Sequence, residues 1–416
     1  MSEVLCELPD VPLLDEFDAP EWGADFTWVA DDLFNREYQG LLRLPDNSVF
    51  VYRNSQVAEL ARHPSVGHQP LDAATRGLTP PGSGADNGVV RFIGASTFPL
   101  LQPEHRPKKQ LITKMLAPRN LGQFREDLVV ILNDLIDECL EVETVDFRSD
   151  FARLAVAGFW RRALGISDSE SLRLVEVAAK TMAPIRIAPT PEQLSAAGPA
   201  AHEFMDILEA ALPRSVADDN APLLRELREW RAGSSFSGED AESYPLVSST
   251  LIDGFHTVIP FLTSMVFALV EAGHQPSRPD REATAFAAAA YQEGSRLHPA
   301  ITGLLRQASD DFVYDGVHIP KGTDIMMAWL FANRDPDVFE APNSYRLDRA
   351  KRIKQLSYGG GHYVCAGRNV AQTLSEMMLV ELTKRSITIE FADTPKWDTG
   401  SMIHELKSLP VRMNSA

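Results

Sequence analysis

The sequence predicts a mainly α-helical fold with a small β region, built as one domain over residues 1–416. Three observations support this. Most long stretches carry apolar residues at helical spacing, a few shorter ones alternate as strands do, and no change of composition or Gly/Ser-rich linker divides the chain. With 44% hydrophobic residues, the chain is long enough to bury one large core. We expect residues 1–25 to form an irregular N-terminal segment, because they are acidic and interrupted by prolines.

Helical and strand-like periodicities assign the individual elements. The segment 312–323 resembles a β-hairpin with Asp315-Gly316 at its turn, because both residue types tolerate the left-handed backbone of a two-residue turn. Proline and glycine are densest between residues 64 and 107, which predicts a long loop region over a site. Helices are predicted over 120–141, 151–165, 168–182, 199–212, 246–272, 281–297 and 366–385, and strands within 42–52, 302–328 and 386–414.

Charge and cysteine content restrict the compartment and the partners. The formal net charge of −18 argues against binding to nucleic acid or to anionic membranes. The N-terminus has the features of neither a signal peptide nor a membrane anchor. Cys6, Cys139 and Cys365 are too few and too scattered for a disulfide framework. A cytoplasmic, monomeric protein is expected.

The segment 358–367 is the strongest sign of chemistry in the chain. A glycine run precedes Cys365, and apolar residues at helical spacing follow it. A cysteine at a helix N-terminus has a lowered pKa, and the thiolate is the form that binds a metal. The alternative from these residues alone is a tight turn with a buried structural cysteine.

The pattern of this segment resembles the haem-binding loop of the cytochrome P450 family. That loop reads aromatic, two residues, Gly, three residues, Cys, one residue, Gly, and here Tyr358, Gly361, Cys365 and Gly367 fill the four positions. The resemblance extends over roughly residues 30–414 and implies the single-domain cytochrome P450 fold. It also implies haem b with Cys365 as axial thiolate and Gly359 in the loop that contacts the haem.

A second family signature stands earlier in the chain at the expected distance. Glu293-Gly-Ser-Arg296 matches the family's Glu-x-x-Arg, whose two side chains share one helix face and form a buried ionic brace behind the haem. The brace includes a further arginine, and both Arg346 and Arg349 lie near enough in sequence to supply it.

The resemblance also implies groups that hold the two haem propionates. His105 and Lys109 lie one helical turn apart in a segment that is similar to the family's haem-contacting helix, and Arg306 matches an arginine of a later strand. Lys109 stands where arginine is more usual. The family usually has His or Arg two residues before the cysteine, whereas this chain has Tyr363 there and His362 one residue earlier. Either side chain can meet a propionate.

The predicted helix 246–272 resembles the helix that crosses the distal face of the haem, and it departs from the family pattern. The family has a small residue, Gly, any residue, an acid and Thr, where this chain has Asp253-Gly-Phe-His256-Thr257. A hydrogen bond from Thr257 to the carbonyl of residue 253, together with Pro260, predicts a local opening of the helix. Thr257, His256 and Asp253 are the predicted catalytic residues. His256 is expected to relay protons, and the alternative is a structural His256 with Asp253 or water as the relay.

The substrate pocket is expected to be mixed aromatic and aliphatic, as buried small-molecule sites are. An inward-facing Arg186 would indicate a carboxylate on the substrate. The predicted lining residues are Phe92, Phe98, Met182, Arg186, Phe255, Thr302 and Ile403.

The family resemblance further implies an electron-transfer partner. An acidic ferredoxin, reduced by NAD(P)H through a ferredoxin reductase, would dock on the thiolate side of the haem. The positive charges expected there are Arg106, Lys108, Lys109, Lys114, Arg119, Arg346, Arg349, Lys351, Arg352, Lys354 and Arg368.

The predicted function is a haem-thiolate monooxygenase that hydroxylates a small organic substrate in secondary-metabolite biosynthesis, with the substrate free or tethered to a carrier. Oxidative coupling, nitration and peroxide-driven oxidation on the same scaffold are alternatives. A haem-thiolate sensor without turnover is a more remote one, because fold alone does not fix function.

Overall fold

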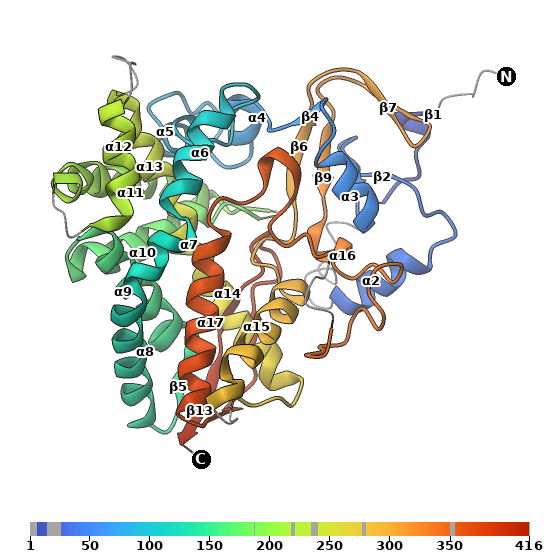
Figure 1. Ribbon diagram of the computed structural model, residues 1–416. Coiled ribbons are helices and arrows are strands. Elements are labelled where there is room, and N and C mark those ends of the chain that lie inside the picture. Colours follow the sequence, from blue (N-terminus) through green and yellow to red (C-terminus); the bar gives the residue numbers. More distant parts are fainter. Residues whose placement is uncertain are drawn as a thin grey trace.

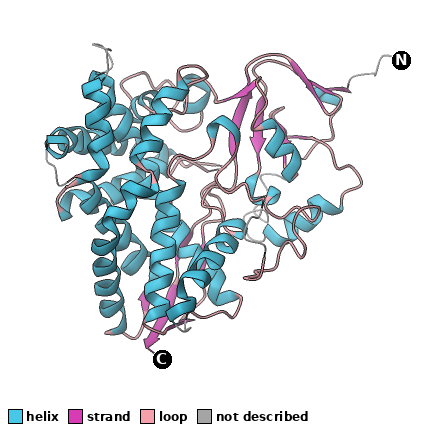
Figure 2. Ribbon diagram, viewed as in Figure 1, coloured by secondary structure: helices cyan, strands magenta, loops and turns pink. Residues whose placement is uncertain are grey.

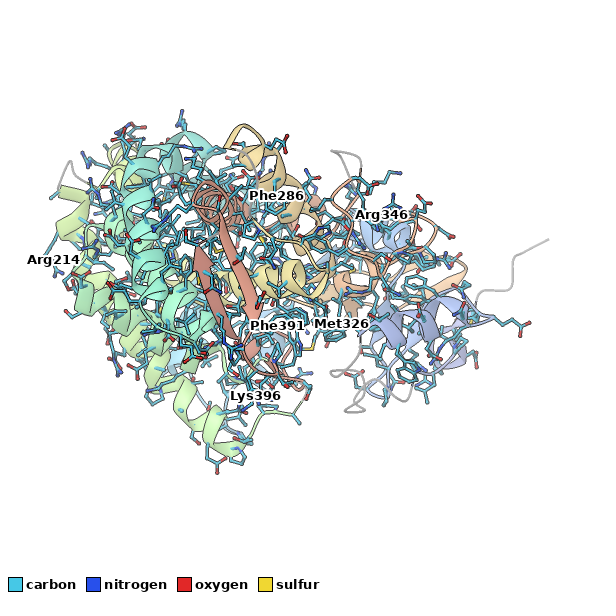
Figure 3. All side chains as sticks on the ribbon, turned by 90° about the horizontal axis from the view of Figure 1, so that it is seen from below. Arg214, Phe286, Met326, Arg346, Phe391 and Lys396 are labelled. Atoms are coloured by element: carbon cyan, nitrogen blue, oxygen red, sulfur yellow. The ribbon has the colours of Figure 1, made fainter. Side chains whose placement is uncertain are left out.

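Helices make up most of the molecule, most of the strands lie at one side of it, and a smaller group of strands lies near the C-terminus (Figure 2). The structure is a computed structural model that describes residues 6–14, 26–186, 188–217, 221–233, 240–276, 280–349 and 354–415. Helices α8 to α13 form one flank, and the larger sheet and the N-terminal elements form the opposite one (Figures 1 and 2). Seen from below, Arg214 marks the outer edge of the helical flank, and Met326 and Arg346 lie toward the strand-rich side (Figure 3).

The helices that carry the predicted site run through the middle of this arrangement. α14 is buried along nearly its whole length, and α15 packs against α17. The α-helices are α2 (Phe26–Asn35), α3 (Asn54–Leu60), α4 (Leu71–Thr75), α5 (Gly88–Ala95), α6 (His105–Met115), α7 (Pro118–Leu121), α8 (Arg125–Leu140), α9 (Arg153–Leu164), α10 (Asp168–Met182), α11 (Pro191–Ala217), α12 (Arg225–Gly233), α13 (Asp240–His256), α14 (Val258–Glu271), α15 (Asp280–Leu297), α16 (Trp329–Ala332) and α17 (Arg368–Lys384).

The strands form four small sheets with the orders β2-β3-β9-β6-β4, β1-β8-β7, β10-β13-β5 and β11-β12. In the largest sheet, β3 and β9 are parallel, and the other pairs are antiparallel. The strands are β1 (Cys6–Glu7), β2 (Leu42–Arg43), β3 (Val49–Val51), β4 (Val66–Gly67), β5 (Val145–Asp146), β6 (Leu304–Ala308), β7 (Phe312–Tyr314), β8 (Val317–Ile319), β9 (Asp324–Met327), β10 (Ile387–Phe391), β11 (Lys396–Trp397), β12 (Leu406–Ser408) and β13 (Pro410–Ser415).

The predicted elements agree with this structure at their centres. The hairpin of β7 and β8 turns at Asp315 and Gly316, whose φ angles of 51° and 74° are the left-handed values that the sequence predicts. The helix predicted over 246–272 is present as α13 and α14, which meet at Thr257. The helix predicted over 199–212 is longer, because α11 continues through two internal prolines.

Two predictions about irregular regions were wrong in part. The region 64–107 is not only loop, because it contains β4, α4 and α5. Asn87 caps α5, accepting a hydrogen bond from the backbone N–H of Val89 at 2.9 Å. Within the N-terminal segment, Cys6 and Glu7 form a strand parallel to β8, because the open edge of that hairpin provides backbone partners.

One helical stretch, Ser243–Glu271, is long and apolar enough to span a bilayer, but 83% of its most apolar window is buried inside the protein. It forms the core of the helical flank, since α14 contacts α9, α15 and α17. Its composition is therefore explained by burial within the protein.

Candidate active site

The Cys365 loop positions its sulfur at the start of a helix. Gly361 has a φ of 62°, and a Cβ there would lie 1.9 Å from the carbonyl oxygen of Ala61, so only glycine fits. The backbone N–H of Cys365 donates to the carbonyl of Tyr358 at 2.9 Å, which closes the loop. α17 begins at Arg368, three residues after the cysteine, as the sequence predicts. The loop thus presents one cysteine from a fixed backbone.

The pKa of the Cys365 thiol differs from the sequence prediction. Burial among protein atoms raises the pKa of the thiol, while backbone N–H groups of Gly367 and Arg368 and the charge of Lys109 lower it. Burial prevails, so the expectation of a lowered pKa from the helix N-terminus alone was wrong. The residue nevertheless keeps accessible surface. A cation bound at the sulfur is what would favour the thiolate here.

Tyr363, rather than His362, faces the predicted propionate groups. Its ring centroid lies 4.8 Å from that of His105, and the guanidinium of Arg306 lies 5.5 Å from it. His362 is exposed, and its carbonyl oxygen accepts a hydrogen bond from Lys109 Nζ at 2.7 Å. The geometry therefore favours Tyr363 among the two alternatives.

Arg306 is a buried cation, and within the described ranges no carboxylate lies in ion-pair distance of it. Its Nη1 donates to the carbonyl of Leu305 at 3.1 Å, and burial lowers the pKa of the guanidinium to about 10. Burial also lowers the pKa of Lys109 to about 8, with the charge of Cys365 acting in the opposite direction. A buried charge of this kind is costly unless an anion pairs with it.

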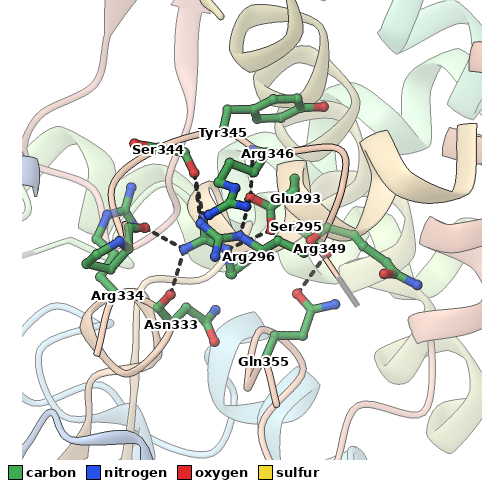
Figure 4. A network of polar contacts seen from close by, with 12 residues as sticks. Glu293, Ser295, Arg296, Asn333, Arg334, Ser344, Tyr345, Arg346, Arg349 and Gln355 are labelled. Atoms are coloured by element: carbon green, nitrogen blue, oxygen red, sulfur yellow. Dashed lines mark hydrogen bonds and ion pairs between the residues drawn. The ribbon is translucent and has the colours of Figure 1, made fainter. Parts of the chain in front are cut away.

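Glu293 and Arg296 form the predicted brace. Arg296 is fully buried and binds the carboxylate through two hydrogen bonds, Nε to Oε1 and Nη2 to Oε2, each 2.9 Å long. Arg349 supplies the third charge, with Nε 3.0 Å from Glu293 Oε2. Arg346 gives that carboxylate its backbone N–H (Figure 4). The side chain of Arg346 pairs with Glu340 and Asp348 instead.

The brace fixes the chain that leads to the cysteine loop. Arg296 Nη1 donates to the carbonyl oxygens of Asn333 and Pro342 at 2.9 and 2.6 Å. Asn333 in turn accepts from the backbone N–H of Leu356 at 2.6 Å and donates to Ser357 Oγ at 2.9 Å. Figure 4 shows these contacts converging on Arg296. The segment before Tyr358 is thus held by buried polar contacts.

Thr257 lies at the predicted opening between α13 and α14. Its Oγ1 and its backbone N–H both approach the carbonyl oxygen of Asp253 at 2.8 Å. Asp253 and Thr257 are both partly exposed within a largely buried helix, and they share one face at i and i+4 spacing. The Asp253 charge is near enough to Cys365 to raise the pKa of its thiol. This face of the helix therefore looks toward the cysteine.

His256 lies elsewhere on the helix. Its side chain is buried, and the charges that act on it are those of Glu405 and Arg148. Burial lowers the pKa of this imidazole, whereas burial raises the pKa of Asp253 to about 7. The geometry thus supports the alternative in which Asp253 is the acid, since no hydrogen bond within the described residues supports a relay role of His256.

The structure places the predicted pocket residues in different surroundings. Thr302 donates through Oγ1 to the carbonyl of Met402 at 3.1 Å and so fixes the turn that carries Ile403. Phe255 is fully buried between Trp160 and Phe204 and belongs to the core, because the helical turn directs it away from the Asp253 face. Phe92 and Met182 are also buried, and Phe98 is half-buried 6.1 Å from the ring of His68.

Arg186 is not free to meet a substrate carboxylate. Its Nη1 and Nη2 bind Asp398 at 3.0 and 2.9 Å, and its backbone forms a bridge with Ser401. The conditional expectation of a substrate carboxylate at Arg186 gains no support here, because Asp398 already pairs with its charge. The pair ties the loop after α10 to the C-terminal turn.

Comparison with known proteins agrees with this geometry. A family model described as Cytochrome P450 matches residues 266–385. Cytochrome P450 144 of Mycobacterium tuberculosis is 26% identical over 314 residues, which is 74% of this chain and 70% of that protein. Luteothin monooxygenase of Streptomyces thioluteus is 24% identical over 409 residues, 98% of this chain and 97% of that protein. The chain is therefore similar to cytochromes P450 over most of its length, and residues 266–385 match the family's model.

Solved structures extend the likeness to cytochromes P450 to almost the whole fold. CalO2 superimposes with a TM-score of 0.82 at 19% identity, covering 97% of this chain and 100% of that one. P450BioI, in complex with an acyl carrier protein that carries hexadec-9Z-enoic acid, gives 0.79 at 19% identity over 95% and 99%. The relatives are named as cytochromes P450 and monooxygenases, so the chain is an oxidoreductase of this type.

The residues present fit the haem-thiolate that the family implies. Cys365 offers an accessible sulfur, and a single axial cysteine needs no cluster of ligands, in agreement with the finding that the described ranges hold no group of three or more His, Cys, Asp or Glu side chains arranged for a metal. Arg306 offers a buried cation for a carboxylate. In a bound haem-thiolate, Cys365 would ligate the iron, and Arg306, His105 and Lys109 would meet the propionates.

Two residues of the site were missed from the sequence. His68 is buried, and its ring centroid lies 4.1 Å from that of Tyr363. Trp160 donates from Nε1 to the carbonyl of Gly254 at 3.0 Å, beside the helix opening. The unusual Tyr363 was a signal that another basic group must stand nearby, but no signal in the sequence pointed to Trp160.

Proposed function

We propose that this protein binds haem b through the Cys365 thiolate and oxidises, most simply by hydroxylation, a small organic substrate with electrons from a ferredoxin. The proposal includes a role in secondary-metabolite biosynthesis in the cytoplasm. The observation that carries it is the position of Cys365 at the head of α17, with the Asp253–Thr257 face of the distal helix looking toward it.

The bound haem would supply the O₂-activating chemistry. The chain's own contribution on the distal side is to hold protons. Asp253 has a pKa of about 7 because of its burial, so its carboxyl group can carry a proton near neutral pH. Thr257 Oγ1 is oriented by the hydrogen bond that it donates to the Asp253 carbonyl, and the lone pairs of this oxygen can still accept a hydrogen bond. These groups can deliver protons to one side of the pocket.

The brace and the loop account for the proximal side. Arg296 and Arg349 hold Glu293, and the segment pinned by them leads into the cysteine loop. Tyr358 accepts a hydrogen bond from Tyr291 at 3.0 Å, and Gly361 brings the backbone close to Ala61. A rigid loop of this kind keeps one sulfur at a fixed position, which a metal ligand requires.

A biosynthetic substrate is supported by the names of relatives. Proteins 23% identical to this chain include the biotin biosynthesis cytochrome P450 and the polyketide biosynthesis cytochrome P450 PksS of Bacillus subtilis. P450BioI, which has the same fold, forms a complex with an acyl carrier protein that carries hexadec-9Z-enoic acid. We include both free and carrier-tethered substrates in the proposal.

The proposed ferredoxin site is smaller than the sequence predicts. Several of its cations are engaged: Arg119 pairs with Glu226, Arg349 with Glu293, and Lys109 binds the carbonyl of His362. Lys351 and Arg352 lie outside the described residues. The exposed cations for which the described part of the chain provides no ion pair are Arg106, Lys114, Lys354 and Arg368. An acidic partner would bind over these four side chains, and added salt should weaken it.

The test begins with the purified ferric protein. A carbon monoxide difference spectrum reports whether thiolate-bound haem is present in the wild type and lost in Cys365→Ala. The ferric protein is then titrated with aromatic amino acids, terpenoids, macrolides, free fatty acids and acyl carrier protein thioesters, and the change of haem spin state is followed. A compound that shifts the spectrum is finally incubated with NAD(P)H, ferredoxin and ferredoxin reductase.

Each outcome separates the candidate functions. Product formed only with the complete electron-transfer chain supports a monooxygenase. Product formed with peroxide alone supports peroxide-driven oxidation, and saturable binding without product under either condition supports the sensor. Absence of thiolate-bound haem in the wild type would refute the proposal.

A further inference from the structure

We propose that His68 binds a haem propionate, and that it does so in place of the basic residue that the family has two positions before the cysteine. This inference rests on the proposed haem binding. In this chain, Tyr363 occupies that position and has no charge to offer below its own pKa, which burial raises. A basic side chain from another element would therefore have to replace it.

The sheet places His68 where such a side chain is needed. β4 pairs antiparallel with β6, with Val66 opposite Ala308 and Gly67 opposite Gln307. The next step of the same register sets His68 opposite Arg306, the buried arginine of the propionate site. His68 therefore lies directly after β4 and beside the propionate site, although it is 297 residues away from Cys365 in sequence.

Aromatic contacts hold His68 inside the cluster of basic groups. Its ring centroid lies 4.1 Å from that of Tyr363 and 5.2 Å from that of His105, the latter at 88°. Tyr363 lies between His68, His105 and the guanidinium of Arg306. The tyrosine therefore acts as a spacer that positions the three basic groups around one volume.

The hydrogen bonds define which ring nitrogens are available. His68 Nδ1 lies 3.0 Å from the carbonyl oxygen of Thr97 and must donate to it, because a carbonyl only accepts. The amide nitrogen of Gln102 lies 3.2 Å from His105 Nδ1, so that nitrogen accepts and Nε2 carries the proton. Within the described residues, Nε2 of His68 and Nε2 of His105 form no hydrogen bond. These two atoms are nevertheless absent from the set of fully buried polar atoms without a partner, so each keeps some accessible surface. Both therefore face accessible space.

The charges around this volume call for an anion. Arg306 on β6 and Lys109 and His105 on α6 all act to lower the pKa of His68, and the structure places no carboxylate near enough to oppose them among the described residues. Burial is the larger cause, and the pKa of His68 falls to about 2. A carboxylate bound between His68 and Arg306 would oppose the effect of these positive charges and would stabilise the charged imidazole through a charge-assisted hydrogen bond.

Proton uptake follows from the tautomer of His68. Because its Nδ1–H is committed to Thr97, the neutral ring offers only a lone pair at Nε2. A carboxylate can bind there only with a proton between the two atoms, so association of ionised haem with the apoprotein takes up one proton at this site. Arg306 and His105 donate without such uptake.

The test compares haem retention in matched variants of the ferric holoprotein. His68→Phe keeps the ring contact with Tyr363 but removes the hydrogen-bonding nitrogens, and Tyr363→His in the His68→Phe background restores a basic group at the family position. His63→Phe is the control, because His63 is on the same stretch of chain but stacks on Phe312 at 4.4 Å. Haem transfer to excess apomyoglobin gives the release rate, and calorimetry in two buffers of different ionisation enthalpy gives the proton uptake.

We expect His68→Phe to release haem at least about ten-fold faster than the wild type, the size expected for one charge-assisted hydrogen bond. The double variant should recover most of this loss, and His63→Phe should match the wild type. Proton uptake should fall by about one in His68→Phe. Reversible denaturation of each apoprotein identifies a variant that merely fails to fold. If His68→Phe fails to fold, His68→Gln, whose side chain is a neutral donor, replaces it in the test and should show the same loss of proton uptake.

Unchanged haem release and unchanged proton uptake in a folded His68 variant would overturn the inference. Equal losses in His63→Phe and His68→Phe, or no recovery in the double variant, would also do so, because the effect would then be one of packing. These results leave the proposed function intact, since the wild type would still show thiolate-bound haem. A wild type that binds no haem would refute both.

Discussion

Arg296 and Glu293 form a two-pronged ion pair with both hydrogen bonds 2.9 Å long and both side chains almost completely buried. The carboxylate also accepts from Arg349, and Arg296 donates to carbonyl oxygens of a segment that starts 37 residues later. A buried pair of charges is costly to form, so its main effect is to make one arrangement of that segment much lower in free energy than the others. That arrangement directs the chain into the cysteine loop.

Removing the third charge of the brace should destabilise the fold. We expect Arg349→Ala to lower the free energy of unfolding by about 3 kcal/mol, because it leaves Glu293 with less compensation for its burial. Arg346→Ala is the matched control. Its side chain pairs only with Glu340 and Asp348 on the surface, so its effect should stay within about 0.5 kcal/mol. Urea denaturation measures both, and equal effects would argue against the brace.

The same carboxylate should make stability depend on acid. Burial would raise the pKa of Glu293, but the hydrogen bonds from Arg296, Arg346 and Arg349 prevail and lower it. A lowered folded-state pKa stabilises the fold above the ordinary pKa of 4.5, and this stabilisation is lost as the pH falls through the folded value. Glu293→Gln should therefore show a weaker loss of stability than the wild type below pH 4.5, measured by denaturation across an acid series.

The sequence predicted the parts of this site whose geometry is local. Spacing along one helix was enough for Glu293 and Arg296, and the order of glycines and cysteine was enough for the loop. It left open whether Arg346 or Arg349 completes the brace, because that choice depends on how a loop folds back over 50 residues. It could not reveal the ion pair of Arg186 for the same reason, since Asp398 is 212 residues away in sequence.

Helix direction explains why the sequence left the role of His256 open. His256 stands at the family's acid position, but burial and the charges of Glu405 and Arg148 show that it faces another part of the protein. Asp253 and Thr257 are one turn apart and share the partly exposed face. The sequence named all three residues and could not choose among them, because the face of a buried helix is set by its packing partners.

The hydroxyl of Thr257 should be needed for coupling rather than for folding. We expect Thr257→Val to reduce product formed per NAD(P)H by about ten-fold and to raise peroxide release, because it removes a positioned proton carrier. Thr263→Val is the control, since Thr263 donates to the carbonyl of Ile259 at 2.8 Å in the same way but within the core. Parallel assays of product and peroxide give the result, and equal coupling in the two variants would contradict the role of Thr257.

Asp253 should set the pH dependence of that coupling. Its pKa is raised to about 7, so the protonated form that can donate is present below this pH and is lost above it. Product per NAD(P)H should therefore fall as the pH rises through 7 in the wild type. Asp253→Asn should remove this dependence, whereas His256→Phe should keep it. The opposite pattern would assign the proton relay to His256.

Gly254 and Trp160 should depend on each other in stability. A Cβ on residue 254 would lie 2.4 Å from Cζ2 of Trp160, and the indole Nε1 donates to the Gly254 carbonyl at 3.0 Å. Trp160 is fully buried against Phe255 and Phe159, so it has no room to withdraw. We expect Gly254→Ala to cost about 2 kcal/mol through overpacking.

A double-mutant cycle separates this clash from a simple loss of helix packing. Trp160→Phe removes the clashing atoms and the hydrogen bond, and it should cost about 2 kcal/mol alone through the cavity and the unpaired carbonyl. In the double variant the added methyl group enters the vacated space, so the combined cost should be smaller than the sum by about 1 kcal/mol or more. Strictly additive costs, measured by urea denaturation, would mean that Trp160 does not determine the requirement for glycine, and that the helix opening beside Thr257 is set by α13 and α14 alone.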